Sequence, residues 1–438
     1  MLINFSVKNF RSIKEEITLS FEATSSLELE DYYIIQPKPD LRLLKLGIIY
    51  GSNASGKTTI LRAIKFIRDL TIDPLDKKTD SLNFQPFLFD TKTSKENSHF
   101  SIEFIQNEVK YLYKLELNND AIISEELFFF NPNKAIVFKR STDSSKQVSE
   151  IVFGSKIKIN KRHKSTLEAN TLWNNTVLGG YLKTNFDSHE LQETTDWFEE
   201  KLKALITPKT NLLGYISSKL ESEEINKNQI VDLLKKADFN ISDIIIKKEE
   251  NDVDSEFIEF LSNKTIMSEE RLSKIKDTGK IESKEIHFKH SIDKTNTEYS
   301  LPYKDESQGT QRYYQFSGLL DLMFNNETIF SIDELESSLH PDLLKHFLLT
   351  FLANSKKSQL IATSHHRELL MDRDIFRNDA IWFTEKNEDG STELFSLEDF
   401  DSSVIRNTSS IFNAYKTGKL GAVPKLSDYY MDLEDGKK

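Results

Sequence analysis

The chain has 438 residues, 38% of them hydrophobic and 30 of them phenylalanine, so it can bury a core and is not an intrinsically disordered chain. Its net charge of −12 argues against a dedicated nucleic-acid coat, although net charge does not exclude a local basic patch. The absence of cysteine excludes disulfides, thiolate metal sites and a cysteine nucleophile. The chain also lacks an apolar run long enough to span a membrane, and we expect a cytoplasmic protein.

The first predicted elements are strands that lead into a phosphate-binding motif. Leu2–Phe10 and Ile17–Phe21 alternate apolar and polar residues, which predicts a β-hairpin. The apolar run Leu46–Tyr50 predicts a strand, which leads into Gly51–Thr58 (Gly-Ser-Asn-Ala-Ser-Gly-Lys-Thr) and then a helix that ends near Thr71. A strand, a Gly-bounded loop and a helix start at this spacing are typical of a P-loop.

The P-loop motif indicates where a nucleotide and a metal ion would bind. Backbone N–H groups of such a loop point at the β- and γ-phosphates, Lys57 adds a positive charge, and the Thr58 hydroxyl can bind Mg²⁺. We therefore expect ATP and Mg²⁺ as cofactors. The candidate nucleotide-binding residues of the loop and helix start are Asn53, Ser55, Gly56, Lys57, Thr58 and Thr59.

The spacing of apolar residues changes twice in the middle of the chain. Short alternating runs between residues 100 and 159 predict an antiparallel meander. Residues 187–238 have helical spacing, and the charged segment 249–284 is expected to be a mobile surface excursion. The helical side chains expected on one face are Leu191, Phe198, Leu202 and Leu205, and a second helical segment runs from Ile225 to Leu234.

The last third predicts parallel α/β layering. Strand signals return at Glu285, Arg312–Phe324 is helical, and residues 327–382 alternate strand and helix. The apolar strand Thr328–Ile332 ends in Asp333 and Glu334. Next to a P-loop, Asp333 is placed to act on Mg²⁺ and Glu334 to polarise a water, although acids at a helix start can also simply complement the helix dipole.

Two further segments carry polar groups at element ends. Strand Gln359–Ser364 ends at His365, which can contact a γ-phosphate or be an ordinary surface histidine; its tip should lie beside the acidic strand's tip. Ser307 and Thr310 precede a helix, where they can cap it or bind a phosphate.

These parts together resemble the ABC-type ATPase heads of the SMC, RecF and OLD group. Asn9-Phe10-Arg11-Ser12 looks like the N-terminal strand motif of that group, and the resemblance implies a nucleotide contact for Arg11. The P-loop carries Ala54 where many members have glycine. Gln85 is similar to the Q-loop glutamine, which adds it to Thr58 and Asp333 as a metal ligand.

The resemblance also assigns roles in the last third. Ser307-Gln-Gly309-Thr310 is similar to the signature motif that completes a partner's site, but it departs from the usual Leu-Ser-Gly-Gly-Gln. Glu336–Pro341, which contains Leu339-His340-Pro341, looks like the D-loop region, and His365 looks like the switch histidine. A homodimer with composite ATP sites, and possible higher oligomers, are implied, with Ser307, Gly309 and Thr310 as nucleotide contacts.

The C-terminal segments 379–383, 389–394 and 415–424 resemble the RloA/AbiLi branch of prokaryotic ATPases, which includes subunits similar to those of Septu- and PARIS-like systems. The resemblance implies an antiviral system in which a separately encoded effector, a nuclease or toxin, is controlled. Too few residues follow Pro424 for a TOPRIM domain, and we expect no nuclease site in this chain.

The predicted fold class is α/β, a P-loop ABC-type ATPase head with a mixed or parallel sheet, flanking helices, an antiparallel β lobe and a helical insertion. The expected parts are residues 1–186, an insertion at 187–284, and residues 285–438. Three hypotheses stay open: a defence ATPase, a RecF/SMC-like DNA-repair or chromosome ATPase, and a platform that barely hydrolyses ATP.

The basic cluster in residues 155–165 has two interpretations. It is either a weak DNA contact or a solvated strand edge protected by lysines. Its members are Lys156, Lys158, Lys161, Arg162 and Lys164.

Overall fold

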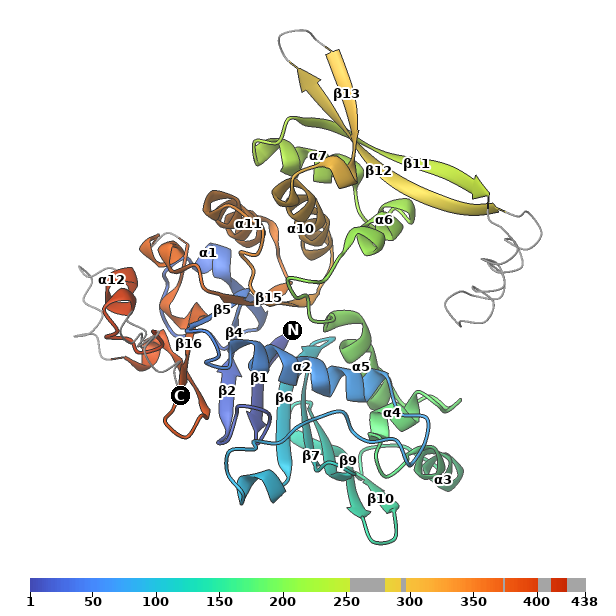
Figure 1. Ribbon diagram of the computed structural model, residues 1–438. Helices are drawn as coiled ribbons and strands as arrows, with labels where there is room; N and C mark the ends of the chain where they lie inside the picture. Colours follow the sequence, from blue (N-terminus) through green and yellow to red (C-terminus); the bar gives the residue numbers. More distant parts are fainter. Residues whose placement is uncertain (253–279, 293–296, 373–374, 401–410, 424–438) are drawn as a thin grey trace, which may run out of the picture. The chain divides into compact units, whose positions relative to one another are not determined.

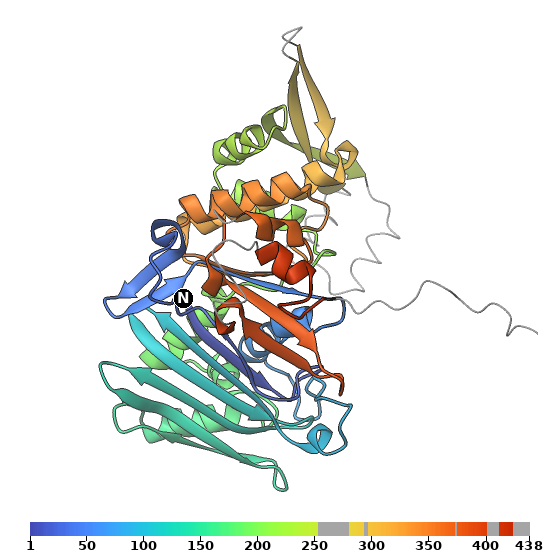
Figure 2. The same cartoon turned by 90° about the vertical axis from the view of Figure 1, so that its left-hand side faces the viewer.

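The computed structural model describes residues 1–252, 280–292, 297–372, 375–400 and 411–423 (Figures 1 and 2). The chain forms two compact units. The first comprises 1–210, 323–337 and 348–438, and the second comprises 211–322 and 338–347. The domain boundaries expected from the sequence at 187 and 285 stay a prediction.

A five-stranded sheet forms the centre of the first unit. Its order is β14-β15-β5-β16-β17, with parallel pairing from β14 through β16 and an antiparallel last strand. Every residue of β14, β15 and β5 is buried, as expected for strands covered on both faces. The strands are β14 (Ile329–Ile332), β15 (Gln359–Ser364), β5 (Leu46–Gly51), β16 (Ile381–Lys386) and β17 (Thr392–Ser396).

The second sheet of this unit is the predicted antiparallel meander together with the N-terminal hairpin. Its seven strands have the order β10-β9-β8-β7-β6-β1-β2, which confirms both predictions. They are β1 (Leu2–Lys8), β2 (Ile17–Ser20), β6 (Ser98–Gln106), β7 (Val109–Leu117), β8 (Ile122–Phe130), β9 (Lys134–Asp143) and β10 (Val148–Phe153).

Helix α2 (Lys57–Ile72) lies across one face of the seven-stranded sheet (Figure 1). The Phe66 ring of α2 is 5.4 Å from Phe100 of β6 and 5.6 Å from Phe10, so aromatic packing fixes the helix on that sheet. The unit's other elements are β3 (Ile34–Lys38), β4 (Leu41–Leu44), α1 (Glu30–Tyr33), α3 (Lys161–Asn170), α4 (Val177–Tyr181), α5 (His189–Asp196) and α12 (Ile411–Lys416).

The second unit combines helices with a three-stranded antiparallel sheet of order β11-β12-β13. Phe288 of β12 packs on Tyr314 of α10 with 5.1 Å between the ring centroids, and the absence of a side chain at Gly318 lets Ile216 of α6 approach the same helix. The elements are α6 (Leu213–Glu221), α7 (Lys227–Lys236), β11 (Ile241–Asp252), β12 (Lys280–Ile292), β13 (Thr297–Pro302), α10 (Gln308–Asn325) and α11 (Pro341–Asn354); the last two helices each continue into the first unit.

Some predicted helical segments are wrong in detail. After α5 and a π-helical turn at Trp197–Lys201, the chain becomes extended, so Leu202 and Leu205 do not lie on a helix. The extended chain forms parallel bridges from Leu202 and Ile206 to β14. These backbone hydrogen bonds satisfy an edge of the central sheet, a non-local demand that apolar spacing cannot reveal.

Other expectations also need correction. Both ends of the segment 249–284 belong to long strands, β11 and β12, and its remainder lies outside the described residues. The second helix expected between 327 and 382 is only a 3₁₀ turn at Arg367–Met371. The basic cluster is not on a strand edge, because it occupies a loop and the first turn of α3.

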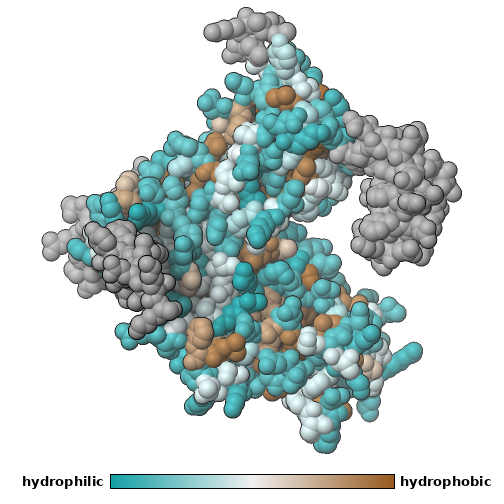
Figure 3. Space-filling view, in the orientation of Figure 1, coloured by the Kyte–Doolittle hydropathy of each residue, from teal (hydrophilic) through white to brown (hydrophobic). Residues whose placement is uncertain are grey.

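Hydrophilic residues predominate on the face seen in Figure 3, where hydrophobic ones form small separate groups. Among the helices of the described ranges, none has the length and apolar content that a membrane span requires.

Candidate functional site: a P-loop and its acidic strand

The P-loop, the acidic strand and the histidine strand end at one edge of the five-stranded sheet. Parallel pairing places Ile332 beside Ala362 and Ser364 beside Tyr50, so the carboxyl ends of β14, β15 and β5 are neighbours. The expectation that the acidic and histidine tips lie side by side is confirmed. Ligands of open α/β sheets bind at this edge.

Lys57 is held inside the loop that precedes it. Its Nζ donates to the carbonyls of Gly51 at 2.9 Å and Ser52 at 3.0 Å, and the side chain is almost fully buried. Burial lowers the pKa of Lys57 to about 8, while the carboxylates Asp333, Glu336 and Glu334 oppose the shift. The lysine therefore remains mainly charged at neutral pH.

A hydrogen-bonded chain joins the P-loop to the acidic strand. The Thr58 hydroxyl lies 2.9 and 3.0 Å from the two oxygens of Asp333, and the Thr363 hydroxyl donates to Asp333 at 2.7 Å. The Glu334 N–H in turn donates to the Thr363 hydroxyl at 2.8 Å. The side chains of two candidate metal ligands and the backbone of Glu334 are thus tied together.

Glu334 and His365 lie at the exposed mouth of this arrangement. Glu334 has a φ of 50°, a left-handed conformation that costs energy in a residue with a side chain and is often found at functional sites. The His365 backbone N–H donates to Glu336 at 2.6 Å. Partial burial of the imidazole and the nearby Lys57 lower the pKa of His365, which favours its neutral form, while the carboxylates Glu336, Glu334 and Asp333 oppose the shift.

The remaining P-loop residues form its outer turn. Ser55 is buried and its hydroxyl lies 2.6 Å from that of Thr384, whereas Asn53 is exposed. Ala54 has a φ of 61° and Gly56 one of 106°. Alanine therefore keeps the left-handed conformation that glycine adopts more easily at the position where many relatives have it.

In the N-terminal motif Asn9–Ser12, Asn9 and Ser12 form hydrogen bonds to different parts of the chain. Asn9 is buried and its side chain bonds the backbone of Phe87, Thr93 and Glu96, which fixes the segment that carries Gln85. Ser12 reaches the first turn of α2, with its hydroxyl 3.1 Å from that of Thr59. The motif therefore links the hairpin turn to the P-loop helix.

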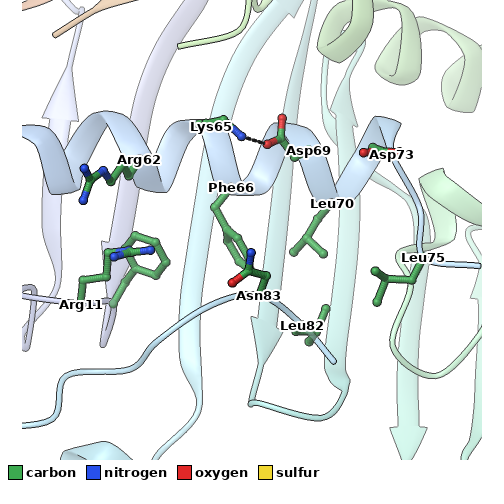
Figure 4. A pocket seen from close by; sticks show the side chains of 11 residues that line it. Arg11, Arg62, Lys65, Phe66, Asp69, Leu70, Asp73, Leu75, Leu82 and Asn83 are labelled. Atoms are coloured by element: carbon green, nitrogen blue, oxygen red, sulfur yellow. Dashed lines mark hydrogen bonds and ion pairs between the residues drawn. The ribbon is translucent and has the colours of Figure 1, made fainter. Parts of the chain in front are cut away.

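Arg11 lines a pocket of about 410 Å³ beside α2 (Figure 4). Arg11 and Arg62 lie at one end of it, and Asp73 and Leu75 at the other. Burial and the positive charge of Arg62 lower the pKa of Arg11, and its Nε is buried without a hydrogen-bond partner. The pocket is lined by two guanidinium groups and the rings of Phe10 and Phe66, which suit an anionic ligand with a planar part, and also by the carboxylates Asp69 and Asp73.

Gln85 is not joined to the Thr58–Asp333 pair by any described hydrogen bond. Its side chain is exposed, and its backbone carbonyl accepts from the Arg11 N–H at 2.8 Å. In the described ranges no three His, Asp or Glu side chains gather into a metal-binding group, so Thr58 and Asp333 are the described candidates for Mg²⁺. A hydroxyl and a carboxylate that share the ion with phosphates and waters are typical Mg²⁺ ligands.

In the second unit, Ser307 caps α10, as one of the two sequence interpretations predicts. Its hydroxyl accepts from the Thr310 N–H at 3.1 Å and lies 2.8 Å from the Thr310 hydroxyl. A side chain added at Gly309 would meet only Ser338 O and Ser307 Oγ, no closer than 3.5 Å. The phosphate contact of these residues stays a prediction.

Sequence patterns assigned no role in the site to four residues that bond the loop or its acids, although two of them lie in motifs that resemble known families. They are Ser12, Thr363, Thr384 and Thr392. A single hydroxyl residue carries no pattern of its own, because its partners lie elsewhere in the chain, 30 positions away for Thr363 and Asp333 and 380 for Thr392 and Ser12. The available signals were the position of Thr363 near the end of an apolar strand and the places of Ser12 and Thr392 in the segments 9–12 and 389–394.

The strand order, the P-loop and the joined acids define an α/β P-loop ATPase fold of the ABC type, which confirms the predicted fold class. The family described as "AAA domain, putative AbiEii toxin, Type IV TA system" matches residues 47–372, and the chain belongs to this family. No curated protein matches the chain.

Solved structures with similarity to the chain include SMC heads. An SMC head bound to the C-terminal winged-helix domain of ScpA is 12% identical, with 90% of this chain and 97% of that chain covered and a TM-score of 0.44. The SMC head domain from Thermotoga maritima is 12% identical, with coverages of 90% and 98% and a TM-score of 0.40. One from Pyrococcus furiosus, bound to a ScpA domain, is 13% identical, with coverages of 96% and 98% and a TM-score of 0.40.

Proposed function

We propose that the chain binds ATP with Mg²⁺ at the P-loop and hydrolyses it, and that this cycle controls a separately encoded effector of an antiviral defence system. The observation that carries the proposal is the hydrogen-bonded chain from Thr58 through Asp333 and Thr363 to Glu334. Positioning and electrostatic stabilisation do most of the work in phosphoryl transfer, and both require groups fixed in advance.

Each residue of the site has a role that its surroundings support. Lys57 exchanges its contacts with the loop carbonyls for the phosphates, Thr58 and Asp333 hold Mg²⁺, and Glu334 orients the attacking water. His365 lies at the mouth with its neutral form favoured, and there it can donate to the γ-phosphate. Gln85 is proposed as a further metal ligand on the resemblance alone.

The nucleoside is expected along α2. Ser12 touches Thr59, and Arg62 lies one helical turn further on, at the end of the pocket that Arg11 shares. We therefore assign Arg11 to the nucleotide. Replacing Arg11 by Ala should raise KM for ATP more than it lowers kcat, since the residue is remote from the acids.

The test of hydrolysis is phosphate release by the purified chain and by its Glu334→Gln variant. We expect the variant to bind ATP and to release phosphate about 100-fold more slowly or worse. Equal rates would remove Glu334 from catalysis. ATP binding without hydrolysis by the unmodified chain would instead leave a nucleotide-bound platform.

We further propose a homodimer in which Ser307, Gly309 and Thr310 of one copy approach the γ-phosphate held by the other. ATP that binds across such an interface stabilises the dimer. Light scattering should show an ATP-dependent increase in mass, most clearly for Glu334→Gln. A monomer with and without ATP, at full activity, would contradict the dimer.

The defence role rests on the tail resemblance and on a family whose description names a toxin of a toxin–antitoxin system. Loss of the γ-phosphate would release the contacts of His365 and so change the state that the effector senses. Phage restriction should need both the chain and its neighbouring gene, and should be lost with Glu334→Gln. Full protection by the chain alone would contradict a separate effector.

A further inference from the structure

A β-hairpin near the C-terminal end of the described chain lies directly against the P-loop. Strand β16 pairs with β5 so that Thr384 is opposite Gly51, the first residue of the loop. The hairpin turn Asn387–Ser391 then reverses the chain, and β17 begins at Thr392. Thr384 and Thr392 therefore reach the same loop from one hairpin.

The Thr392 hydroxyl is the centre of a small network. It lies 3.0 Å from the Ser55 carbonyl oxygen and 2.8 Å from the Ser12 hydroxyl, which is itself 3.1 Å from the Thr59 hydroxyl. The Thr392 N–H also donates to the Ser12 carbonyl at 2.7 Å. One side chain thus connects the outer turn of the P-loop, the β1–β2 turn and the first turn of α2.

Close contact reinforces these hydrogen bonds. A Cβ added to Gly56 would lie 2.1 Å from the Thr392 hydroxyl oxygen, and one added to Gly51 would lie 2.4 Å from the Thr384 hydroxyl oxygen. Each of the two glycines that bound the loop is therefore backed by a threonine of the hairpin. The loop cannot shift toward the hairpin, and its Ser55 carbonyl is bonded there.

We propose that Thr392 is a positioning residue for nucleotide binding, whose hydroxyl holds the P-loop in its phosphate-binding conformation from the carbonyl side. This gives a role to the tail segment 389–394. The part of the proposal that concerns ATP rests on the proposed function, whereas the effect on the loop itself does not.

The test compares Thr392→Val, which keeps the shape but removes the hydroxyl, with Thr392→Ser, which restores it. Thr195→Val is a matched control, because Thr195 is equally buried and bonds backbone carbonyls in α5. Hydrogen exchange of peptides covering residues 51–58 is measured without nucleotide, and ATP affinity is measured separately. Thermal unfolding shows whether each variant is folded.

One neutral hydrogen bond corresponds to about a three- to tenfold change in an equilibrium constant. We expect exchange in the P-loop peptide to accelerate by about that factor in Thr392→Val, and ATP affinity to fall equally, with kcat at saturating ATP much less affected. Thr392→Ser should recover both, and Thr195→Val should change neither. Should Thr392→Val fail to fold, Ser12→Ala is expected to give the same exchange signature.

Unchanged exchange and unchanged ATP affinity in folded Thr392→Val would overturn the positioning role. So would equal effects of Thr195→Val. If the unmodified chain binds no ATP, the proposed function fails, yet the exchange comparison still decides whether Thr392 holds the loop.

Discussion

The phosphate-binding edge of the central sheet and the N-terminus of α10 both carry residues that the sequence assigns to one nucleotide site, but they are built in different ways. At the sheet edge, Thr58, Asp333 and Thr363 bond one another across three segments of the chain. At α10, Ser307 and Thr310 bond each other within one turn, and a Cβ added at Gly309 would make ordinary van der Waals contacts with Ser338 O and Ser307 Oγ.

The difference between the two regions lies in how their polar side chains are held. The sheet edge is organised in advance, which lowers the cost of ordering polar groups around a ligand. The α10 turn has its hydroxyls employed in a cap, and Gly309 beside them is half-buried. A serine cap of this kind is common at helix starts, and the composite site stays a proposal.

The largest effect is expected from removing the charge at the organised edge. Lys57→Ala should weaken ATP binding by about 100-fold or more, because Lys57 is the buried cation of the loop. Lys92→Ala is the control, since Lys92 is 86% exposed on the surface. Titration with a fluorescent ATP analogue measures both. Equal affinity in the two variants would show that the P-loop is not the nucleotide site.

A smaller effect is expected from Thr363→Val, which takes the hydrogen bonds from Asp333 and from the Glu334 N–H. Phosphate release should slow by about tenfold, because a bond to a charged group is worth more than a neutral one, while ATP affinity changes less. Thr363→Ser should recover the rate. A variant that loses ATP affinity but keeps kcat would contradict the role of Thr363 in holding the catalytic acids.

The pH dependence of ATP binding is expected to come from the sheet edge, because α10 carries no titrating group at Ser307–Thr310. The pKa of Lys57 is lowered to about 8 by burial, and the protonated lysine is the form that binds phosphate. Affinity should be nearly constant below pH 7 and fall by about fourfold between pH 7 and 8.5 as the lysine loses its proton. Calorimetry across this range should also show proton uptake on binding. Affinity that rises with pH would contradict the assignment.

The smallest effect is expected at the basic cluster. Lys161 and Arg162 occupy the first turn of α3, where positive charge opposes the helix dipole. Any DNA contact there should be weak and fall steeply with salt, and reversing both charges to Glu should lower the affinity about threefold while slightly raising stability. Fluorescence anisotropy at two salt concentrations measures this. Affinity unchanged by the reversal would leave the cluster a solvated surface.

The sequence predicted the parts of the molecule that depend on local pattern. The spacing in Gly51–Thr58 identified the strand, loop and helix, and two-residue alternation identified the meander. The helix expected through Leu205 was wrong because apolar spacing does not distinguish a helix from an extended edge that bonds β14. The ends of β11 and β12 were missed because their sequence, rich in lysine and glutamate, lacks the apolar–polar alternation that predicts a strand.

The residues of the candidate site also fall into those that a local pattern predicts and those that it does not. Lys57, Asp333 and Glu334 follow from motifs, whereas the hydroxyls of Thr363 and Thr392 act through partners that only the folded chain brings near. A sequence motif identifies the residues that are expected to contact the ligand. It does not identify the residues that hold those side chains in position.

The most direct test of a site shared between two copies is complementation of two inactive variants. Lys57→Ala removes the cation of the sheet edge, and Gly309→Glu adds a charged side chain to the α10 turn, where its Cβ would come no closer than 3.5 Å to its own chain. In an equal mixture, about one quarter of the sites of a symmetric dimer would combine an intact P-loop with an intact turn. Phosphate release should therefore recover to about that fraction of the unmodified rate, and a mixture as inactive as either variant alone would contradict the composite site.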